Sequence, residues 1–440
     1  MLDLKHEFAP LVLLHIQSEG RTTMANGTHM GKAGIPHSAL ATAYWNEEIG
    51  RQIVTLAHDA FGYHASLDID RGNIAISFGR TPPPAPMSHR REQLDWVEKS
   101  RPFSQMSDGI KAFCGVALEV LAGQHAYLLL DEPDAYLHPP LAFKLGAMIA
   151  KHAISRQKTV LASTHSSQLV MGALQAARSV DIVRLSNDGD QITARKLDNH
   201  VLRHMMRNPL MRSANVMSSL FYDGVVICED DTDRAFYQEV HARLVEAGEV
   251  ALKSILFLNL NGKDRIHQLL APLRQMGIPT AGIFDIDFLS SDTTKYTDTI
   301  ISAGIDKDDQ KFAKPRTNAW SAMKASSRAP KKDGLGLLKG AQLREAEELL
   351  ERFSQYGIGI VPVGELECWL RDMGVTVSNG NKKEWLPQIF DRFGDDPSSG
   401  DYVKPSTGDV WEFVKHVVNW IADPNRLGMP QAGAPASNTV

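Results

Sequence analysis

The stretch AYLLLDEPDAYLHP, residues 126–139, carries an apolar run that stops at two adjacent acids, Asp131 and Glu132. A continuous apolar run of this kind is typical of a central strand that is buried on both faces of a parallel sheet. Open α/β sheets bind their ligands at the carboxyl ends of such strands. One acid of the pair can hold a metal ion there while the other orients a water molecule, although an isolated pair at a helix start would simply face solvent. The stretch therefore predicts an α/β fold, and its neighbours decide between these alternatives.

The overall composition limits the class of protein. The chain has 440 residues, enough for two or three domains, and its 43% hydrophobic content is ordinary for a packed core. A net charge of −5 means that any nucleic-acid binding must come from local basic patches. Cys114, Cys228 and Cys368 lie far apart, which suits a reducing compartment and excludes a disulfide framework or a cysteine zinc site. Because the chain also lacks a secretion signal and any apolar stretch near the ~20 residues of a membrane span, we expect a cytoplasmic protein without membrane contact.

Strand and helix patterns alternate in the first half of the chain. Residues 64–79 alternate in polarity around a turn and predict a hairpin. A turn and an apolar helix follow at 104–123, ahead of the strand at 126–131 and a helix at 140–156. Residues 158–164 predict another buried strand, which ends at His165.

A second strand and helix alternation begins after a hairpin that turns at residues 187–190. Apolar strands end near Glu229, Asn259 and Asp287, and helical patterns follow the first two, which predicts a second parallel α/β unit. We therefore expect a first domain at 1–215 and a second at 216–425, with a helical C-terminal extension. The tail at 426–440 is predicted to be disordered.

Three short motifs of the first half carry residues suited to nucleotide chemistry. Ser107 and Gly109 lie at a helix start, where bare backbone N–H groups and the helix dipole favour a phosphate. Asp131 can hold Mg²⁺ through water, while Glu132 orients or deprotonates an attacking water. His165 can donate a hydrogen bond to a terminal phosphate. Alone, each motif has a simpler explanation, namely a capped helix, a solvated acid pair and a core histidine.

In this order and spacing, the motifs resemble those of the ATP-binding cassette ATPases of the DNA-repair and OLD (overcoming lysogenization defect) type. LLLDEPDAYLHP looks like their Walker B motif with its D-loop, SDGIKAF like a divergent signature, and STHS like the switch histidine. The resemblance implies ATP as a ligand. It also implies a homodimer or a larger assembly, because these ATPases hold nucleotide between two subunits.

The phosphate-binding loop of these ATPases, GxxxxGK[ST], has no clear counterpart in the sequence. The nearest string is GTHMGKAG at 27–34, which is one residue short and has Ala33 where a metal-binding hydroxyl is needed. Three explanations stay open: the chain begins after the loop, the loop is supplied elsewhere, or the cassette no longer hydrolyses ATP. We therefore expect weak ATP binding by this chain alone.

Acids also end the strands of the second half. Glu229 follows one strand and Asp233 lies four residues later, while Asp285 and Asp287 are two residues apart at the end of another. Spacing of two puts both carboxylates on one face of a strand. Carboxylates gathered at one sheet edge repel one another unless a cation joins them, and all-oxygen ligands point to Mg²⁺ or Mn²⁺. The alternative is that these acids cap helices and solvate loops. A further strand near 357–363 is followed by Glu365 and Glu367.

The pattern resembles the E-G-x-x-D and D-x-D motifs of TOPRIM domains, and more widely the OLD-family nucleases. The resemblance makes Glu229 a metal ligand or acid/base, Asp233 its support, and Asp285 and Asp287 metal ligands.

The resemblance to OLD-family nucleases also assigns another metal-binding acid to Glu367 in GELE and a transition-state lysine to Lys404 in YVKP. NGKDRI at 261–266 looks like the family's linker element. Asp230 replaces the usual glycine, and we expect it to tolerate a left-handed turn.

The segment 304–345 is strongly basic. Between residues 307 and 344, ten basic residues stand against three acids, a local charge of +7 in a chain of net −5. The segment carries Trp320 and follows the Asp285 strand directly, so we expect a cationic loop that binds a phosphate backbone. A solvated insertion would explain the same charge. The basic residues are Lys307, Lys311, Lys314, Arg316, Lys324, Arg328, Lys331, Lys332, Lys339 and Arg344, and Arg203, Arg207 and Arg212 add to them.

Together the resemblances imply an ATP-regulated, Mg²⁺-dependent DNA endonuclease of OLD-like type, a class linked to phage defence and open to an accessory defence protein. The main alternative is a DNA-binding regulatory protein with an inactive cassette and no cleavage. A topoisomerase would need a tyrosine on a separate DNA-gate domain, and a primase would need a zinc module. The expected fold is an ATPase-like α/β domain followed by a doubly wound, parallel-sheet TOPRIM domain.

Overall fold

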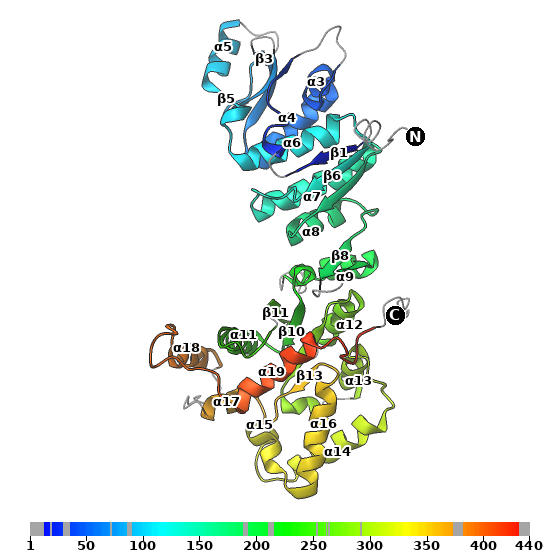
Figure 1. The fold of residues 1–440 in the computed structure, drawn as a ribbon, viewed down its shortest axis with the longest axis vertical. Helices are drawn as coiled ribbons and strands as arrows, with labels where there is room; N and C mark the ends of the chain where they lie inside the picture. The colour runs from blue at the N-terminus through cyan, green and yellow to red at the C-terminus, as the bar shows by residue number, and fades with distance from the viewer. Residues whose placement is uncertain are drawn as a thin grey trace, which may run out of the picture. The chain divides into compact units, whose positions relative to one another are not determined.

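A computed structural model of the chain divides into two compact units, residues Met1–Ile182 and Val183–Val440 (Figure 1). The structure describes residues 13–17, 20–29, 36–70, 73–85, 90–187, 192–209, 215–251, 254–260, 262, 265–290, 293–372 and 382–430. None of the helices in these ranges is long and apolar enough to cross a membrane.

The first unit contains a parallel sheet whose strand order is β1-β6-β7. The central strand β6 is the predicted strand before the acid pair, and its Leu128 and Leu130 are buried. Helices α6, α7 and α8 supply Phe113, Leu145 and Leu169 to the same core. The elements are β1 (Leu13–Ile16), α6 (Asp108–Ala122), β6 (Tyr127–Asp131), α7 (Pro139–Ser155), β7 (Thr159–Ser163) and α8 (Ser167–Ala176).

The other face of this sheet corrects the prediction that both strands are buried. Tyr127 of β6 is 48% exposed and Leu161 of β7 is 57% exposed. Among the described residues, β7 pairs only with β6, so it lies at an edge. An apolar strand is compatible with helices packed on both of its faces. Its actual burial depends on which elements pack on each face. Here the described helices bury one face only.

A second, antiparallel sheet of this unit contains the predicted hairpin, which is confirmed at residues 64–79. Strand β2, Thr28–His29, pairs with β4 at the edge of this sheet. The string GTHMGKAG therefore begins in a different sheet from Asp131, and its residues 30–34 lie outside the described part of the chain. The remaining elements are η1 (Gly20–Thr22), α3 (Ala39–Trp45), α4 (Glu47–Phe61), β3 (His64–Asp70), β4 (Asn73–Gly79), α5 (Arg90–Lys99), β5 (Arg101–Pro102) and η2 (Phe103–Gln105).

The second unit begins with the predicted hairpin of β8 (Val183–Asn187) and β9 (Ile192–Lys196). Its turn residues 188–190 lie outside the described residues. Arg184 donates hydrogen bonds to the carbonyl oxygens of Leu220 and Tyr222 at 3.0 and 2.9 Å, which ties the hairpin to this unit. The structural division thus falls at 182/183, whereas the sequence predicted a boundary at 215/216.

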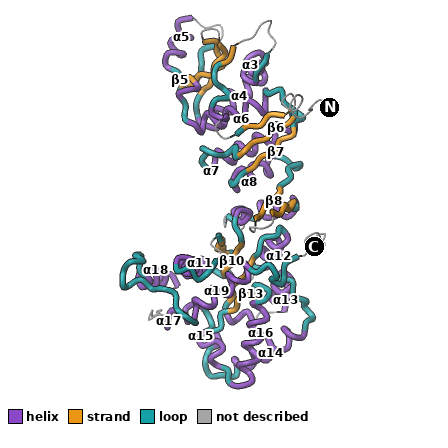
Figure 2. Tube along the Cα trace, in the orientation of Figure 1, coloured by secondary structure: helices purple, strands orange, loops and turns teal. Residues whose placement is uncertain are grey.

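The centre of the second unit is a parallel sheet, as the sequence pattern predicted, and its strand order is β11-β10-β12-β13. Figure 2 shows its labelled strands β10 and β13 among the helices of this unit. Strands β10 and β12 lie side by side and are buried along their whole length. Their carboxyl ends therefore meet at one edge of the sheet. The elements here are α9 (Asn199–Arg207), η3 (Val216–Phe221), β10 (Gly224–Cys228), α11 (Asp231–Glu246), β11 (Ile255–Asn259), α12 (His267–Gln275), β12 (Thr280–Phe284) and β13 (Ile358–Ile360).

The basic segment 304–345 is helical, which corrects the expected loop. Helix α14 buries Phe312, Ala319 and Met323, and α16 buries Leu349 and Phe353 on the side that packs against it. These apolar positions recur at helical spacing between the charged residues, and this buried stripe stabilises the helices. The elements are η5 (Ile286–Ser290), α13 (Thr293–Ser302), α14 (Gln310–Lys324), α15 (Pro330–Asp333), η6 (Gly334–Leu337) and α16 (Gly340–Ser354).

The helical C-terminal extension packs on the second unit. Helix α19 places Val414 and Val418 in the core that also contains Phe236 of α11. The buried guanidinium of Arg243, near the end of α11, donates hydrogen bonds to the carbonyl oxygens of Phe393 and Val403, both at 2.9 Å. The elements are α17 (Leu366–Asp372), α18 (Lys382–Phe393) and α19 (Asp409–Ala422).

Candidate functional site

Three predicted acids meet at the carboxyl edge of the second unit's sheet. Glu229 directly follows β10, Asp285 directly follows β12, and Asp287 lies in the first turn of η5. Because β10 and β12 are parallel neighbours, their ends bring residues 56 positions apart into contact. One carboxylate oxygen from each acid lies within 4.8 Å of the others. We call Glu229, Asp285 and Asp287 the acid cluster.

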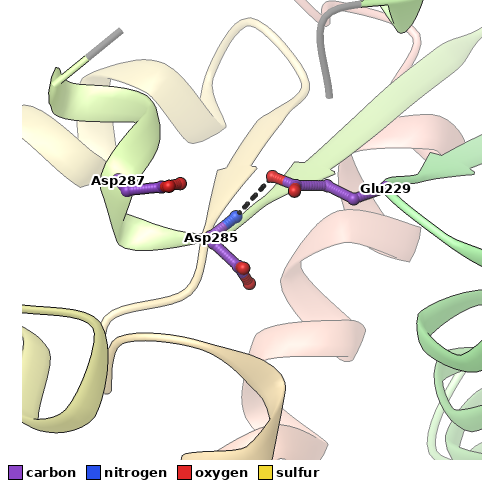
Figure 3. A group of neighbouring side chains, drawn as sticks. All are labelled: Glu229, Asp285 and Asp287. Carbon is purple, nitrogen blue, oxygen red and sulfur yellow. Dashed lines mark hydrogen bonds between the residues drawn. The ribbon is translucent and has the colours of Figure 1, made fainter. Parts of the chain in front are cut away.

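A backbone hydrogen bond orients the acid cluster. The N–H group of Asp285 donates to Glu229 Oε1 at 3.0 Å, shown as the dashed line in Figure 3. The carboxylates of Glu229 and Asp287 point toward each other across this bond (Figure 3). Asp285 is buried and the other two acids are half-buried. Gathering three carboxylates in so small a space is unfavourable unless a positive charge is shared among them.

A lysine supplies positive charge to the acid cluster. The Lys331 ammonium nitrogen lies 3.1 Å from Asp287 Oδ2 and 3.7 Å from Asp285 Oδ2. Partial burial acts to lower the Lys331 pKa, but the charges of Asp287 and Asp285 outweigh it, so the pKa lies above its ordinary value. The sequence pattern placed Lys331 in the basic segment beside the metal-binding acids, where it was expected to contact a DNA phosphate, and did not predict an ion pair with those acids. No spacing rule links these positions, because Lys331 and Asp287 are 44 residues apart.

Asp230 caps the first turn of α11, in which Asp233 lies. Asp230 Oδ1 accepts hydrogen bonds from the backbone N–H groups of Thr232 and Asp233 at 2.9 and 3.0 Å. Its φ is −136°, so the expected left-handed turn is wrong, and this residue is instead an extended N-cap. Asp233 is buried. Burial raises the Tyr237 pKa well above its ordinary value, and the negative charges of Asp233 and Asp285 raise it further.

The structure does not bring every predicted residue into the acid cluster. Glu367 lies in the first turn of α17 and is outside the group of acids whose oxygens meet within 4.8 Å. The negative charge of Glu365 instead contributes to the raised pKa of the Lys331 ammonium group. Lys404 is exposed. The preceding residue, Val403, bonds Arg243 at the far end of α11, ~15 Å along the helix from Asp233.

Asp131, Glu132 and His165 meet at the carboxyl edge of the first unit's sheet. Ser163 of β7 donates a 2.7 Å hydrogen bond to Asp131 Oδ1. The Ser163 carbonyl and hydroxyl oxygens both accept from the backbone N–H of Glu132, at 3.1 and 3.2 Å. His165 Nε2 lies 3.4 Å from Glu132 Oε1. Glu132 has a φ of +44°, a left-handed conformation that is uncommon outside glycine. The ends of the adjacent strands β6 and β7 thus bring two acids and a histidine close together.

The predicted phosphate-facing helix start lies beside the turn that follows the acid pair. Ser107 is the N-cap residue of α6. A Cβ atom on Gly109 would lie 2.8 Å from the Tyr136 carbonyl oxygen, so only glycine allows this approach. The first unit therefore combines strand-end acids with a nearby helix start, while its described residues contain no glycine-rich phosphate loop on this sheet.

Two family models match the chain, one in each unit. Residues 69–171 match a family described as an AAA domain, putative AbiEii toxin, of a type IV toxin–antitoxin system. Residues 220–287 match a family described as an overcoming lysogenization defect protein-like TOPRIM domain. The first range contains Ser107, Asp131 and His165, and the second contains all of the acid cluster.

Solved structures similar to the chain include two from studies of SMC proteins. One, from a study of the structural biochemistry of ATP-driven dimerization and DNA-stimulated activation of SMC ATPases, is 17% identical, covers 37% of this chain and 93% of its own, and has a TM-score of 0.25. The other, an Smc head domain with a coiled coil and joint from Pyrococcus yayanosii, is 17% identical, covers 37% and 30%, and has a TM-score of 0.26. No curated protein matches the chain.

Proposed function

Because the chain joins an AAA-type ATPase domain to an OLD-like TOPRIM domain, as an OLD-family ATPase–TOPRIM fusion does, we propose that it is a divalent-metal-dependent DNA endonuclease regulated by ATP. The single observation that supports cleavage is the acid cluster, three carboxylates held at one sheet edge by two parallel strands. A role in phage defence is part of the proposal and rests on the family resemblance alone.

The donor set of the acid cluster fits a hard divalent cation. All its donors are carboxylate oxygens, the ligands that Mg²⁺ and Mn²⁺ prefer. The Lys331 ammonium lies against the Asp285 and Asp287 carboxylates that would also attract such a cation, and its charge substitutes for part of the metal's charge. When bound, the metal would supply an activated water and stabilise the leaving oxygen of a phosphodiester.

The residues of the chain have distinct roles in this proposal. Asp285 and Asp287 hold the cation, and Asp285 is well suited because its burial limits its motion. Glu229 completes the site, since the Asp285 amide fixes its carboxylate toward the other two acids. The Asp230 cap holds the start of α11 in place beside them. Exposed lysines on α14 offer phosphate contacts nearby in the same unit.

The nucleotide part of the proposal assigns Asp131 and Glu132 to Mg²⁺ and water, and His165 to a phosphate. Their convergence at adjacent strand ends supports a nucleotide site. We propose ATP as a regulator, and a homodimer or larger assembly, on the resemblance to cassette ATPases. An inactive cassette on a DNA-binding protein is the alternative, favoured by the lack of a phosphate loop among the described residues of this sheet.

Plasmid nicking tests the proposed cleavage. Asp287→Ala should lower the nicking rate by orders of magnitude while DNA binding largely persists, and Mn²⁺ should rescue it better than Mg²⁺. Asp298→Ala is the matched control, because Asp298 is an exposed aspartate on the next helix. Thermal melting checks that all proteins are equally folded.

Nicking by Asp287→Ala at the parent rate would exclude the acid cluster as the active site. DNA binding by the parent with no nicking in either metal would favour the regulatory alternative.

A further inference from the structure

The ammonium group of Lys331 is placed where it can either neutralise the acid cluster or leave it. Its nitrogen contacts Asp287 Oδ2 at 3.1 Å, a hydrogen-bonding distance, and lies 3.7 Å from Asp285 Oδ2. The side chains of these two acids are only 16% and 10% exposed, whereas that of Lys331 is 46% exposed. The ammonium group therefore approaches the acids from the solvent side.

The backbone of Lys331 is held by close packing against the loop after β13. A Cβ atom on Gly364 would lie 2.2 Å from the Lys331 carbonyl oxygen, and Gly364 has a φ of +125° that favours glycine. The Cys368 thiol donates to the same carbonyl oxygen at 3.3 Å. Leu335, just after α15, donates a 2.8 Å backbone hydrogen bond to Pro362. These contacts fix the Lys331 backbone beside the acids whether or not its side chain binds them.

The side chain itself can move without disturbing this packing. A lysine ammonium is carried on a flexible four-carbon stem, and the Lys331 side chain is half-exposed, so leaving the acids returns its charge to solvent at modest cost. A divalent cation bound by Asp285 and Asp287 would repel the ammonium group and occupy the same carboxylate oxygens. The fixed backbone would keep the displaced group within reach of anything bound at the metal.

We propose that Lys331 is an internal counter-ion of the acid cluster that divalent metal displaces, and that the displaced ammonium group then binds a phosphate of the DNA. The proposal rests on the proposed nuclease function and deepens it. It assigns Lys331 a role that differs from that of the other basic residues, because its availability to DNA depends on metal. In the absence of metal, the same ammonium group reduces repulsion among the carboxylates.

Metal titration without DNA tests the displacement. Calorimetry with Mn²⁺ should give Lys331→Met a lower dissociation constant than the parent, by up to about fivefold, the factor expected when the half-exposed ammonium group no longer competes for the carboxylates. Lys331→Met should also melt at a lower temperature than the parent without metal, and gain more melting temperature when Mn²⁺ is added. Lys324→Met is the control, since it removes the same charge from an exposed lysine that stands over Trp320.

The outcomes separate this proposal from the proposed function. Equal Mn²⁺ affinity and equal metal-induced melting shifts for Lys331→Met, Lys324→Met and the parent would overturn the displacement while leaving the metal site intact. Failure of the parent to bind Mn²⁺ would overturn both proposals. Tighter binding confined to Lys331→Met would support the counter-ion role.

DNA binding at several salt concentrations tests the second step. With Ca²⁺ present, Lys331→Met should reduce the salt dependence of binding by about one phosphate contact, and without divalent metal it should leave that dependence unchanged. Lys324→Met should have the same effect in both conditions, whatever its size. A metal-independent effect of Lys331→Met, or none in either condition, would exclude the metal-gated phosphate contact.

Discussion

The backbone N–H of Asp285 donates a 3.0 Å hydrogen bond to Glu229 Oε1, and this bond joins the ends of two neighbouring parallel strands. It uses a main-chain group of one acid to orient the side chain of another. The acid cluster is therefore organised before any cation binds, because its geometry depends on strand pairing as well as on side-chain charge. The same bond separates the effects of two substitutions at Glu229.

Glu229→Gln and Glu229→Ala should differ in stability but not in activity. Glutamine can still accept from the Asp285 amide, so its melting temperature should match that of the parent. Alanine removes the acceptor from a partly buried N–H and should cost about 1–3 kcal/mol. Both remove a carboxylate, so both should lose nicking activity by two or more orders of magnitude. Urea unfolding beside plasmid nicking makes the comparison, and equal stability of the two variants would contradict the role of the hydrogen bond.

Exposed lysines on α14 and beside α16 should set the salt dependence of DNA binding. Replacing Lys311, Lys314 and Lys339 by methionine should reduce the slope of log affinity against log salt by up to ~2.7, about 0.9 for each phosphate that is no longer neutralised. Fluorescence anisotropy with a short duplex gives the slope.

Lys99, Lys144 and Lys151 provide a control set for that measurement. All three are exposed lysines of the first unit, so their replacement changes net charge by the same amount. An unchanged slope after replacement of Lys311, Lys314 and Lys339 would assign the basic segment to solvation alone.

ATP binding by this chain should be weak. The site can bind a metal ion through Asp131, orient a water through Glu132 and donate a hydrogen bond to a terminal phosphate through His165. Most phosphate affinity in such sites, however, comes from backbone N–H groups of a glycine-rich loop. We expect a dissociation constant no tighter than about 1 mM, close to 4 kcal/mol of binding free energy. Isothermal titration calorimetry measures it. Micromolar binding that is lost in Lys32→Ala would instead identify GTHMGKAG as a working phosphate loop.

The buried thiol of Cys114 should make stability fall at alkaline pH. Burial raises its pKa to about 12 from the ordinary 9.0. Because the folded pKa lies above the unfolded one, the stability linked to this thiol is present below pH 9.0 and is lost as the pH rises toward 12. Between pH 8 and pH 10 the parent should therefore lose about 1.4 kcal/mol more unfolding free energy than Cys114→Ala.

The comparison for Cys114 uses the pH dependence and not the absolute stability. Cys114→Ala also leaves a small cavity, but the cost of that cavity is the same at both pH values. Urea unfolding of both proteins at pH 8 and pH 10 gives the difference. Parallel losses for the two proteins would show that this thiol does not titrate as its burial requires.

Local sequence patterns determined the strands and the residues at their ends. Alternation of polarity predicted the hairpin at 64–79, and apolar runs predicted β6, β10 and β12 together with the acids that follow them. These predictions succeed because strand formation depends on neighbouring residues, and because parallel strands place their carboxyl ends at one edge. The motifs at those ends also carried the family resemblance that both family models bear out.

Burial and capping depended on what the rest of the chain places beside a residue. The composition of β7 predicted a buried strand, yet Leu161 is 57% exposed because no described element covers that face. Asp230 was expected in a left-handed turn, but the start of α11 supplied two N–H groups for its side chain and favoured an extended N-cap. In the same way, buried apolar positions that face α16 made α14 a helix despite its charge.

Only the tertiary structure decided which lysine contacts the acid cluster. The sequence motif favoured Lys404, but the chain around it bonds to the far end of α11. Lys331 reaches Asp287 instead, although 44 residues separate them, because Gly364 and Cys368 hold the Lys331 backbone against the loop after β13. The sequence by itself determined the acids, since their position follows from the strands that carry them. Their partner depends on packing between distant loops, and no local pattern encodes that contact.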